Sequence, residues 1–153
     1  MAEGSRTKGL SFFKPYCDTP WIFQGTGSMG DYTCERRFER ILGGKFVRME
    51  VLWQVAKHTY GEVAIFGKTA PGVDSSHKGL CFSSFTTEGK ASLGLQVTPE
   101  DLSTGGIAFE ADMPAGRARM MLWPEGREVL WLTVASRNAS GWKPFLEQRL
   151  TPG

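Results

Sequence analysis

Short turn signals recur along the whole chain, and they constrain the fold more than any other feature. They include Gly43-Gly44, Pro71-Gly72, Glu88-Gly89 and Gly105-Gly106. Between the signals lie runs of roughly 7–13 residues that are rich in β-branched and aromatic types, the pattern of antiparallel strands in a sandwich or barrel. The predicted strands are 20–28, 31–42, 45–57, 60–68, 79–86, 89–97, 106–112, 116–123, 128–137 and 142–150.

Apolar and polar residues alternate within several of these runs. The expected inward faces are Val47, Met49, Val51, Trp53 and Val55 in one run, Ala91, Leu93, Leu95 and Val97 in a second, and Ile107, Phe109, Ala111 and Met113 in a third. The opposite faces are mainly polar. A period of two with one polar face indicates strands that are half buried against a single core.

Helical patterns are scarce. Gly9 to Tyr16, just before the first predicted strand, can form a short helix, and Pro15 limits its length. The 153 residues match one domain. The sequence therefore predicts an all-β fold, an antiparallel up-and-down β-barrel of about ten strands with a short N-terminal helix. We expect a flexible N-terminus at 1–9 and a single domain at 10–151.

The charged stretch ERRFERILGG at 35–44 has two interpretations. On a helix its apolar residues would form a stripe and its charges would be solvated. On a strand, Arg36 and Arg40 would share a face with Phe38 among other apolar residues. The strand is favoured because turn signals flank this run and a strongly alternating run follows it. Both guanidinium groups are then expected to enter the barrel.

Two inward arginines would need compensating groups, because an unpaired buried charge costs on the order of 3–5 kcal/mol. A bound carboxylate or phosphate would supply them. An internal salt bridge with Glu50, Glu110 or Asp112 would also do so, as would a position at the barrel rim. The same alternatives apply to Arg119 on another predicted strand, if its side chain points inward. The sequence leaves these alternatives open.

The aromatic and methionine content indicates a small-molecule pocket. The chain has five tryptophans, ten phenylalanines and six methionines, and a barrel of this size can enclose one small ligand. A filled aromatic core is the alternative. The candidate ligand-binding residues are Trp21, Arg36, Phe38, Arg40, Met49, Trp53, Phe82, Phe109, Arg119 and Trp131.

Charge and composition argue against several other functions. The formal net charge of +2 is too small to indicate a nucleic-acid partner. No segment is apolar enough for a membrane span. Cys17, Cys34 and Cys81 are scattered and form no C-x-x-C pair, so we expect reduced thiols and a cytoplasmic protein. His58 and His77 fall near turns without other metal ligands, so no metal or cofactor is expected.

Several segments occur in a familiar order. They are WIFQGTG, the charged second strand, LGGKFVRMEV, VAIFG, FTTEGKASLG and MPAGRARMMLWP. In this order the chain resembles small bacterial lipocalin-like proteins of unknown function, which belong to the calycins with nitrobindin and the fatty-acid-binding proteins. The resemblance implies a barrel of about ten strands with a pocket. Nitrobindin-like proteins bind haem through a histidine late in the chain, but no histidine follows His77 here. Fatty-acid-binding proteins hold a carboxylate with an Arg-x-Tyr pair in a late strand, but no tyrosine stands two residues after Arg117 or Arg119. Neither of these sites carries over to this chain.

These observations favour binding of a small hydrophobic or amphipathic molecule, with an acidic head group near Arg36 and Arg40. The alternative is a lipocalin-like enzyme, a cyclase or isomerase, with Glu50, Glu110, Asp112 or His58 as a titratable group in the pocket. A third interpretation, an interaction domain, requires an exposed apolar patch on the barrel wall. A homodimer is compatible with all three.

Overall fold

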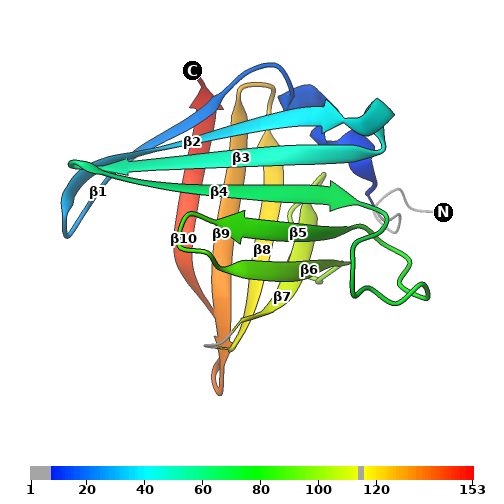
Figure 1. Ribbon diagram of the computed structural model, residues 1–153. Coiled ribbons are helices and arrows are strands. Elements are labelled where there is room, and N and C mark those ends of the chain that lie inside the picture. The colour runs from blue at the N-terminus through cyan, green and yellow to red at the C-terminus, as the bar shows by residue number, and fades with distance from the viewer. Residues whose placement is uncertain (1–7, 114–115) are drawn as a thin grey trace.

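The structure is a computed structural model that describes residues 8–113 and 116–153. Ten antiparallel strands close into a single barrel (Figure 1), so the predicted fold class is confirmed. The strands are β1 (Trp21–Gly27), β2 (Gly30–Ile41), β3 (Phe46–Val55), β4 (His58–Gly67), β5 (Cys81–Thr86), β6 (Ala91–Val97), β7 (Ile107–Met113), β8 (Gly116–Glu125), β9 (Val129–Asn138) and β10 (Gly141–Pro152). Most of the N-terminus at 1–9 lies outside the described residues, so its flexibility stays a prediction.

Each strand pairs with the next one in the chain, and β1 closes the barrel by pairing with β10. The closing contact joins Trp21 to Pro152 and Ile22 to Thr151. Because successive strands reverse direction, the turns β1–β2, β3–β4, β5–β6, β7–β8 and β9–β10 gather at one end, called here the hairpin end. The opposite end carries two short 3-10 helices, η2 (Leu10–Tyr16) and η3 (Leu42–Gly44), and is called the helix end.

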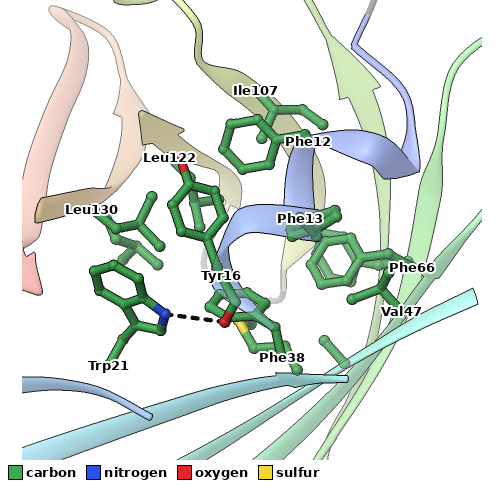
Figure 2. Close-up of a cluster of buried hydrophobic side chains, with 14 of the residues drawn as sticks. Phe12, Phe13, Tyr16, Trp21, Phe38, Val47, Phe66, Ile107, Leu122 and Leu130 are labelled. Atoms are coloured by element: carbon green, nitrogen blue, oxygen red, sulfur yellow. Dashed lines mark hydrogen bonds between the residues drawn. The ribbon is translucent and has the colours of Figure 1, made fainter. Parts of the chain in front are cut away.

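Helix η2 fills the helix end of the barrel, where the sequence predicted a short helix. Phe12, Phe13 and Tyr16 are buried, and Phe13 has no exposed surface. The Phe13 ring lies between Phe38, with centroids 5.6 Å apart, and Phe66, with centroids 4.8 Å apart (Figure 2). This packing gives the barrel a solid aromatic core at one end.

The junction between η2 and β1 is fixed by a hydrogen bond as well as by packing. The Trp21 indole Nε1 donates to the Tyr16 carbonyl oxygen at 3.0 Å (Figure 2). A buried indole N–H needs such a partner, and here the partner is a backbone carbonyl at the end of the helix. The same tryptophan packs edge-on against the Tyr16 ring, with centroids 5.4 Å apart.

One strand faces opposite to its predicted orientation. In β6 the sequence pattern placed Leu93 and Leu95 inward, but the register pairs Gly94 with inward-facing Phe82. The Phe82 ring occupies the space above Gly94, where a Cβ would lie only 2.0 Å from a ring carbon. Buried Gln96 faces inward as well. The aromatic side chain of one strand therefore requires the glycine of its neighbour, and this contact overrides the apolar pattern.

Buried Gln96 has a structural role near the helix end. Its side-chain oxygen accepts a hydrogen bond from the Leu80 N–H at 2.7 Å, and its amide nitrogen donates to the Lys8 carbonyl at 2.8 Å. Gln96 thus satisfies backbone groups of two loops, as a buried polar side chain must. Within the described ranges, no helix has the length and apolar character needed to cross a membrane.

Replacing Phe13 with alanine should destabilise the fold strongly. The variant leaves a cavity between Phe38 and Phe66, and a buried phenylalanine truncation costs about 3–5 kcal/mol. Chemical denaturation measures the free energy of unfolding. Phe85, whose side chain is 55% exposed, provides the matched control, because Phe85→Ala should change that free energy by less than about 0.5 kcal/mol. Equal effects of the two substitutions would show that η2 does not pack into the barrel.

Candidate ligand-binding cavity

The interior between the η2 core and the hairpin end contains a cavity of about 470 Å³. This volume lies in the range of small-molecule sites in proteins. Its walls are mainly apolar, and the larger wall residues are Met49, Trp53, Phe82, Phe109, Met120, Val134 and Leu146. Below the exposed Glu88 and Lys90, the polar lining includes the ionisable groups Arg36 and Glu62. The interior of the cavity thus combines an apolar wall with one cationic and one acidic side chain.

Arg36 is a buried cation whose direct partners are neutral. Its side chain comes from the middle of β2, and the residue is only 4% exposed. The guanidinium Nε donates to the Gln148 side-chain oxygen at 3.0 Å, and Nη1 lies 3.7 Å from the Met49 sulfur. Among the described residues, no carboxylate reaches salt-bridge distance of Arg36. Burial lowers the pKa of this guanidinium.

A further donor beside Arg36 is unused. The Gln148 side chain has no exposed surface, and its Nε2 has no hydrogen-bond partner within the described part of the chain. The Gln148 side-chain oxygen accepts the hydrogen bond from Arg36. The remaining Nε2 group carries only N–H donors and can accept nothing. Around Arg36, which lines the cavity, donors therefore outnumber oxygen acceptors among the described residues, and this surplus suits an anion.

Glu62 is the acidic counterpart of Arg36 in the cavity. The strand register aligns Arg36 with Val51, Val51 with Glu62, and Glu62 with Thr86, so these four residues form one line across β2 to β5. Neighbouring strands lie about 4.8 Å apart, which sets the Arg36 and Glu62 backbones roughly 10 Å from each other. The short, buried side chain of Val51 lies between them. Glu62 thus shares the cavity with Arg36 without forming a salt bridge.

Burial dominates the protonation of Glu62. Removal from water raises the pKa of its carboxyl group, and the positive charge of Arg36 opposes this shift only in part. A carboxyl group in a mainly apolar cavity favours its neutral form for this reason. The result is a group in the cavity that can accept or release a proton at a pH above the usual range of a glutamate.

The cavity opens at the hairpin end. Glu88 and Lys90, on the turn between β5 and β6, stand at this mouth together with Met113 and Phe145. Phe145 is 66% exposed and sits in β10 at a register shift between Pro144 and Leu146. The proline has no N–H to donate to the neighbouring strand, which accounts for the irregularity there. The mouth therefore carries both exposed apolar and charged side chains.

The candidate residues from the sequence divide into three groups. Arg36, Met49, Trp53, Phe82 and Phe109 line the cavity. Trp21 and Phe38 belong to the core around η2, at the filled end of the barrel. Arg40, Arg119 and Trp131 do not line the cavity. Half of the proposed site thus comes together in one place, and the remainder serves the core or the outer surface.

Arg40 differs from Arg36 in depth. It lies just before the end of β2 at Ile41, and its side chain is exposed beside Gly44 of η3. The expectation that both guanidinium groups enter the barrel therefore holds for Arg36 alone. At the level of Arg40 the interior is already occupied by the aromatic side chains of η2, so a long charged side chain turns to solvent.

Arg119 lies on the outer wall in a cluster of charges. Its Nη2 is 3.0 Å from a Glu110 carboxylate oxygen, and its guanidinium stacks over the Trp142 ring at 4.1 Å from the centroid. Arg117 binds the other Glu110 oxygen at 2.7 Å. Burial raises the pKa of Glu110, but hydrogen bonds from both arginines outweigh it, so the pKa is lowered. Of the open alternatives, Arg119 forms a salt bridge with Glu110, but on the outer wall and not inside the barrel.

Trp131 also faces outward, which corrects the expectation that it projects into the barrel. It stacks on Trp123, with centroids 6.1 Å apart and planes 12° from parallel. Its indole Nε1 donates to the Glu125 carboxylate at 2.7 Å. The neighbours Leu130 and Leu132 have no exposed surface and occupy the inner positions of β9.

None of the four titratable residues proposed from the sequence, Glu50, Glu110, Asp112 and His58, lines the cavity. Glu62 was missed. The signal was present, because Tyr60, Glu62, Ala64 and Phe66 alternate along β4, which places Glu62 on the same face as buried Phe66. A glutamate between tyrosine and alanine on such a face points toward the interior, and Glu62 is half-buried there.

The outer wall also carries some exposed apolar surface. Leu52 is 39% exposed and Phe85 is 55% exposed, and both line a shallow hollow over β2 to β5. Glu35 and Arg37 border the same hollow. Single exposed apolar side chains are normal on soluble proteins, and nothing in this hollow points to a partner of particular chemistry.

No protein-family model matches the chain, and none of the curated proteins matches its sequence. The description of the cavity therefore depends on its own geometry.

Glu62→Gln should change how stability depends on pH. In the folded protein the pKa of Glu62 is raised above its usual value of 4.5, so the folded state holds the proton more tightly than the unfolded state does. Between the unfolded and folded pKa values, the free energy of unfolding should therefore fall as pH rises. The variant Glu62→Gln lacks this pH-dependent decrease in the free energy of unfolding.

Denaturation at a series of pH values measures this difference. Glu50→Gln is the control, because Glu50 is exposed on the outer wall and pairs with Arg48 at 3.0 Å. Identical pH profiles for the wild-type protein and Glu62→Gln would contradict a half-buried Glu62 that holds its proton more tightly in the folded state.

Proposed function

We propose that this barrel binds a small amphipathic molecule, with an acidic head group at Arg36 and an apolar body along the cavity wall. The observation that carries the proposal is the buried guanidinium group, which faces a cavity and has only neutral direct partners. A buried cation without a close counter-charge is costly. A ligand anion at Arg36 offsets that cost.

The chemistry of arginine favours a carboxylate or a similar anion. Because Nε is bound to Gln148, the terminal nitrogens Nη1 and Nη2 are the ones available to a ligand, and Nη1 has only a weak sulfur contact. A planar guanidinium binds two oxygens of one anion well. A hydrogen bond to a charged group contributes about 1.5–3 kcal/mol.

The remaining walls suit the apolar part of such a ligand. Phe82 and Phe109 close the inner end of the cavity, where both rings pack on Phe66. Met113 and Ala118, next to the turn between β7 and β8, line it near the mouth. A chain or ring of modest size fits a volume of about 470 Å³. The proposal places this protein with the calycin-like carriers that its barrel resembles. Its three free cysteines fit a reducing cytoplasmic location.

Arg36→Met tests the proposed anchor. Decanoate, a carboxylate with a ten-carbon chain, serves as the probe, and the neutral decanol serves as its analogue. We expect decanoate affinity to fall by about 10- to 100-fold in Arg36→Met, which corresponds to the loss of a charge-assisted hydrogen bond. Decanol affinity should change little. Quenching of tryptophan fluorescence follows binding, because Trp53 lies on the cavity wall.

Arg40→Met is the matched control for this experiment. It removes the same charge from the same strand, but from an exposed position at the helix end. Its decanoate affinity should equal that of the wild-type protein. Equal affinity of wild-type protein and Arg36→Met, or the absence of saturable binding to the wild-type protein, would contradict the proposal.

A second candidate function is catalysis of proton transfer, and Glu62 is the observation that favours it. A carboxyl group with a raised pKa in an apolar cavity is suited to general acid–base work. Arg36 in the same cavity would stabilise the negative charge that develops on a substrate carbonyl oxygen. The reaction class is isomerisation through proton abstraction next to a carbonyl group.

Hydrogen exchange tests this second function. An apolar ketone incubated with the protein in D₂O should exchange its α-protons, followed by NMR, and Glu62→Gln should abolish the exchange. Exchange at the uncatalysed rate with wild-type protein would leave binding as the sole function of the cavity.

A further inference from the structure

We propose that the cavity takes up its anionic ligand together with one proton, which Glu62 holds in the complex. The inference rests on the proposed function and specifies the ligand class as monoanions. Glu62 would then determine both the charge of the ligand and the pH range in which it binds. It acts as a specificity-determining residue, and Arg36 is the anchor.

The positions of the two groups carry the argument. Arg36 and Glu62 lie on the same inner line, two strands apart, with only Val51 between them. An anion bound at the terminal nitrogens of Arg36 lies in the same cavity as the Glu62 carboxyl group. If Glu62 stayed ionised, two negative charges would face one positive charge in a mainly apolar space, where charge interactions are strong.

A proton on Glu62 removes this conflict. Without ligand, and at a pH above the Glu62 pKa of the free protein, Arg36 and ionised Glu62 balance each other in sum, although they form no close pair. With a monoanion at Arg36, the balance is restored only when Glu62 is neutral. A neutral carboxyl group can also donate its O–H to an oxygen of the head group, whereas an ionised one can only accept.

No other charged group of the described chain is placed to take over this role. The inner positions of β3 next to Glu62 are Met49, Val51 and Trp53, and those of β5 are Ser84 and Thr86. Tyr60 precedes Glu62 on β4, and Cys34 stands beside Arg36 on β2, where burial raises its pKa and keeps it neutral. Glu88 and Lys90 are exposed at the mouth, so their charges are screened by water.

The electrostatic surroundings of Glu62 support the same conclusion. Burial raises the pKa of its carboxyl group, and the charge of Arg36 is the influence that holds the pKa down. A ligand anion at Arg36 cancels that influence, so the pKa rises further on binding. By linkage, the affinity for the anion must then fall as pH increases through this range.

Calorimetry with decanesulfonate tests the inference. The sulfonate head group stays ionised at every pH used, so any proton taken up on binding goes to the protein. Titrations in two buffers with different ionisation enthalpies give the number of protons. At a pH above the Glu62 pKa of the free protein, we expect net uptake that approaches about one proton and an affinity that falls up to about tenfold per pH unit.

Two variants separate Glu62 from other groups. Glu62→Gln should bind decanesulfonate without proton uptake and with an affinity that does not change with pH. Glu50→Gln, an exposed carboxylate on the neighbouring strand β3, should behave as the wild-type protein does. Each variant is checked for a cooperative thermal transition well above the titration temperature before titration.

The outcomes distinguish this inference from the proposed function. Saturable binding to the wild-type protein without proton uptake overturns the inference and leaves the binding function intact. Uptake that persists in Glu62→Gln also overturns it, because another group then holds the proton. If neither decanoate nor decanesulfonate binds the wild-type protein, the proposed function fails and the inference fails with it.

Discussion

The packing of η2 into one end of the barrel determines where a ligand can lie. The inward side chains of the ten strands do not fill the interior of the barrel by themselves. At the helix end, Phe13 fills the remaining space between Phe38 and Phe66. The Trp21 hydrogen bond to the Tyr16 carbonyl fixes the helix relative to β1. The rest of the interior remains a cavity of about 470 Å³ that opens at the hairpin end.

Arg36 stands at the boundary between the filled core and the cavity. Several other arginines form salt bridges on the outer wall. Arg117 and Arg119 both bind Glu110, and Arg48 binds Glu50. Arg36 is more deeply buried than these, yet its hydrogen bond goes to a neutral amide. This contrast is the physical reason to connect Arg36 with ligand binding rather than with fold stability.

The sequence predicted the fold well because turn chemistry and alternation are local properties. All ten strands, the short helix and the inward face of β2 follow from them. Depth along a strand is not local, so the pattern did not separate Arg36 from Arg40, which share a face but lie at different levels of the barrel. Contacts between strands also escape the pattern: the ring of Phe82 above Gly94 turned the leucines of β6 outward.

The candidate site was predicted in part for the same reasons. Large apolar residues on an inner strand face can be recognised from the alternation pattern. For this reason the sequence predicted Met49, Trp53, Phe82 and Phe109 in the cavity wall. Trp131 was misplaced because an outward tryptophan can bury its surface against Trp123 instead of a core. Glu62 was missed because a glutamate is expected in solvent, although the alternation along β4 places it on the inner face. Its relation to Arg36 depends on the pairing of three strands, which the sequence pattern does not give.

The most direct test of the account is a crystal structure of the protein with bound decanoate. The account predicts the carboxylate at the terminal nitrogens of Arg36, within hydrogen-bond distance, and the alkyl chain directed along the apolar wall toward Met113 at the mouth. A carboxylate at Lys90, with the alkyl chain in the interior and Arg36 still bound only to Gln148 and Met49, would contradict it.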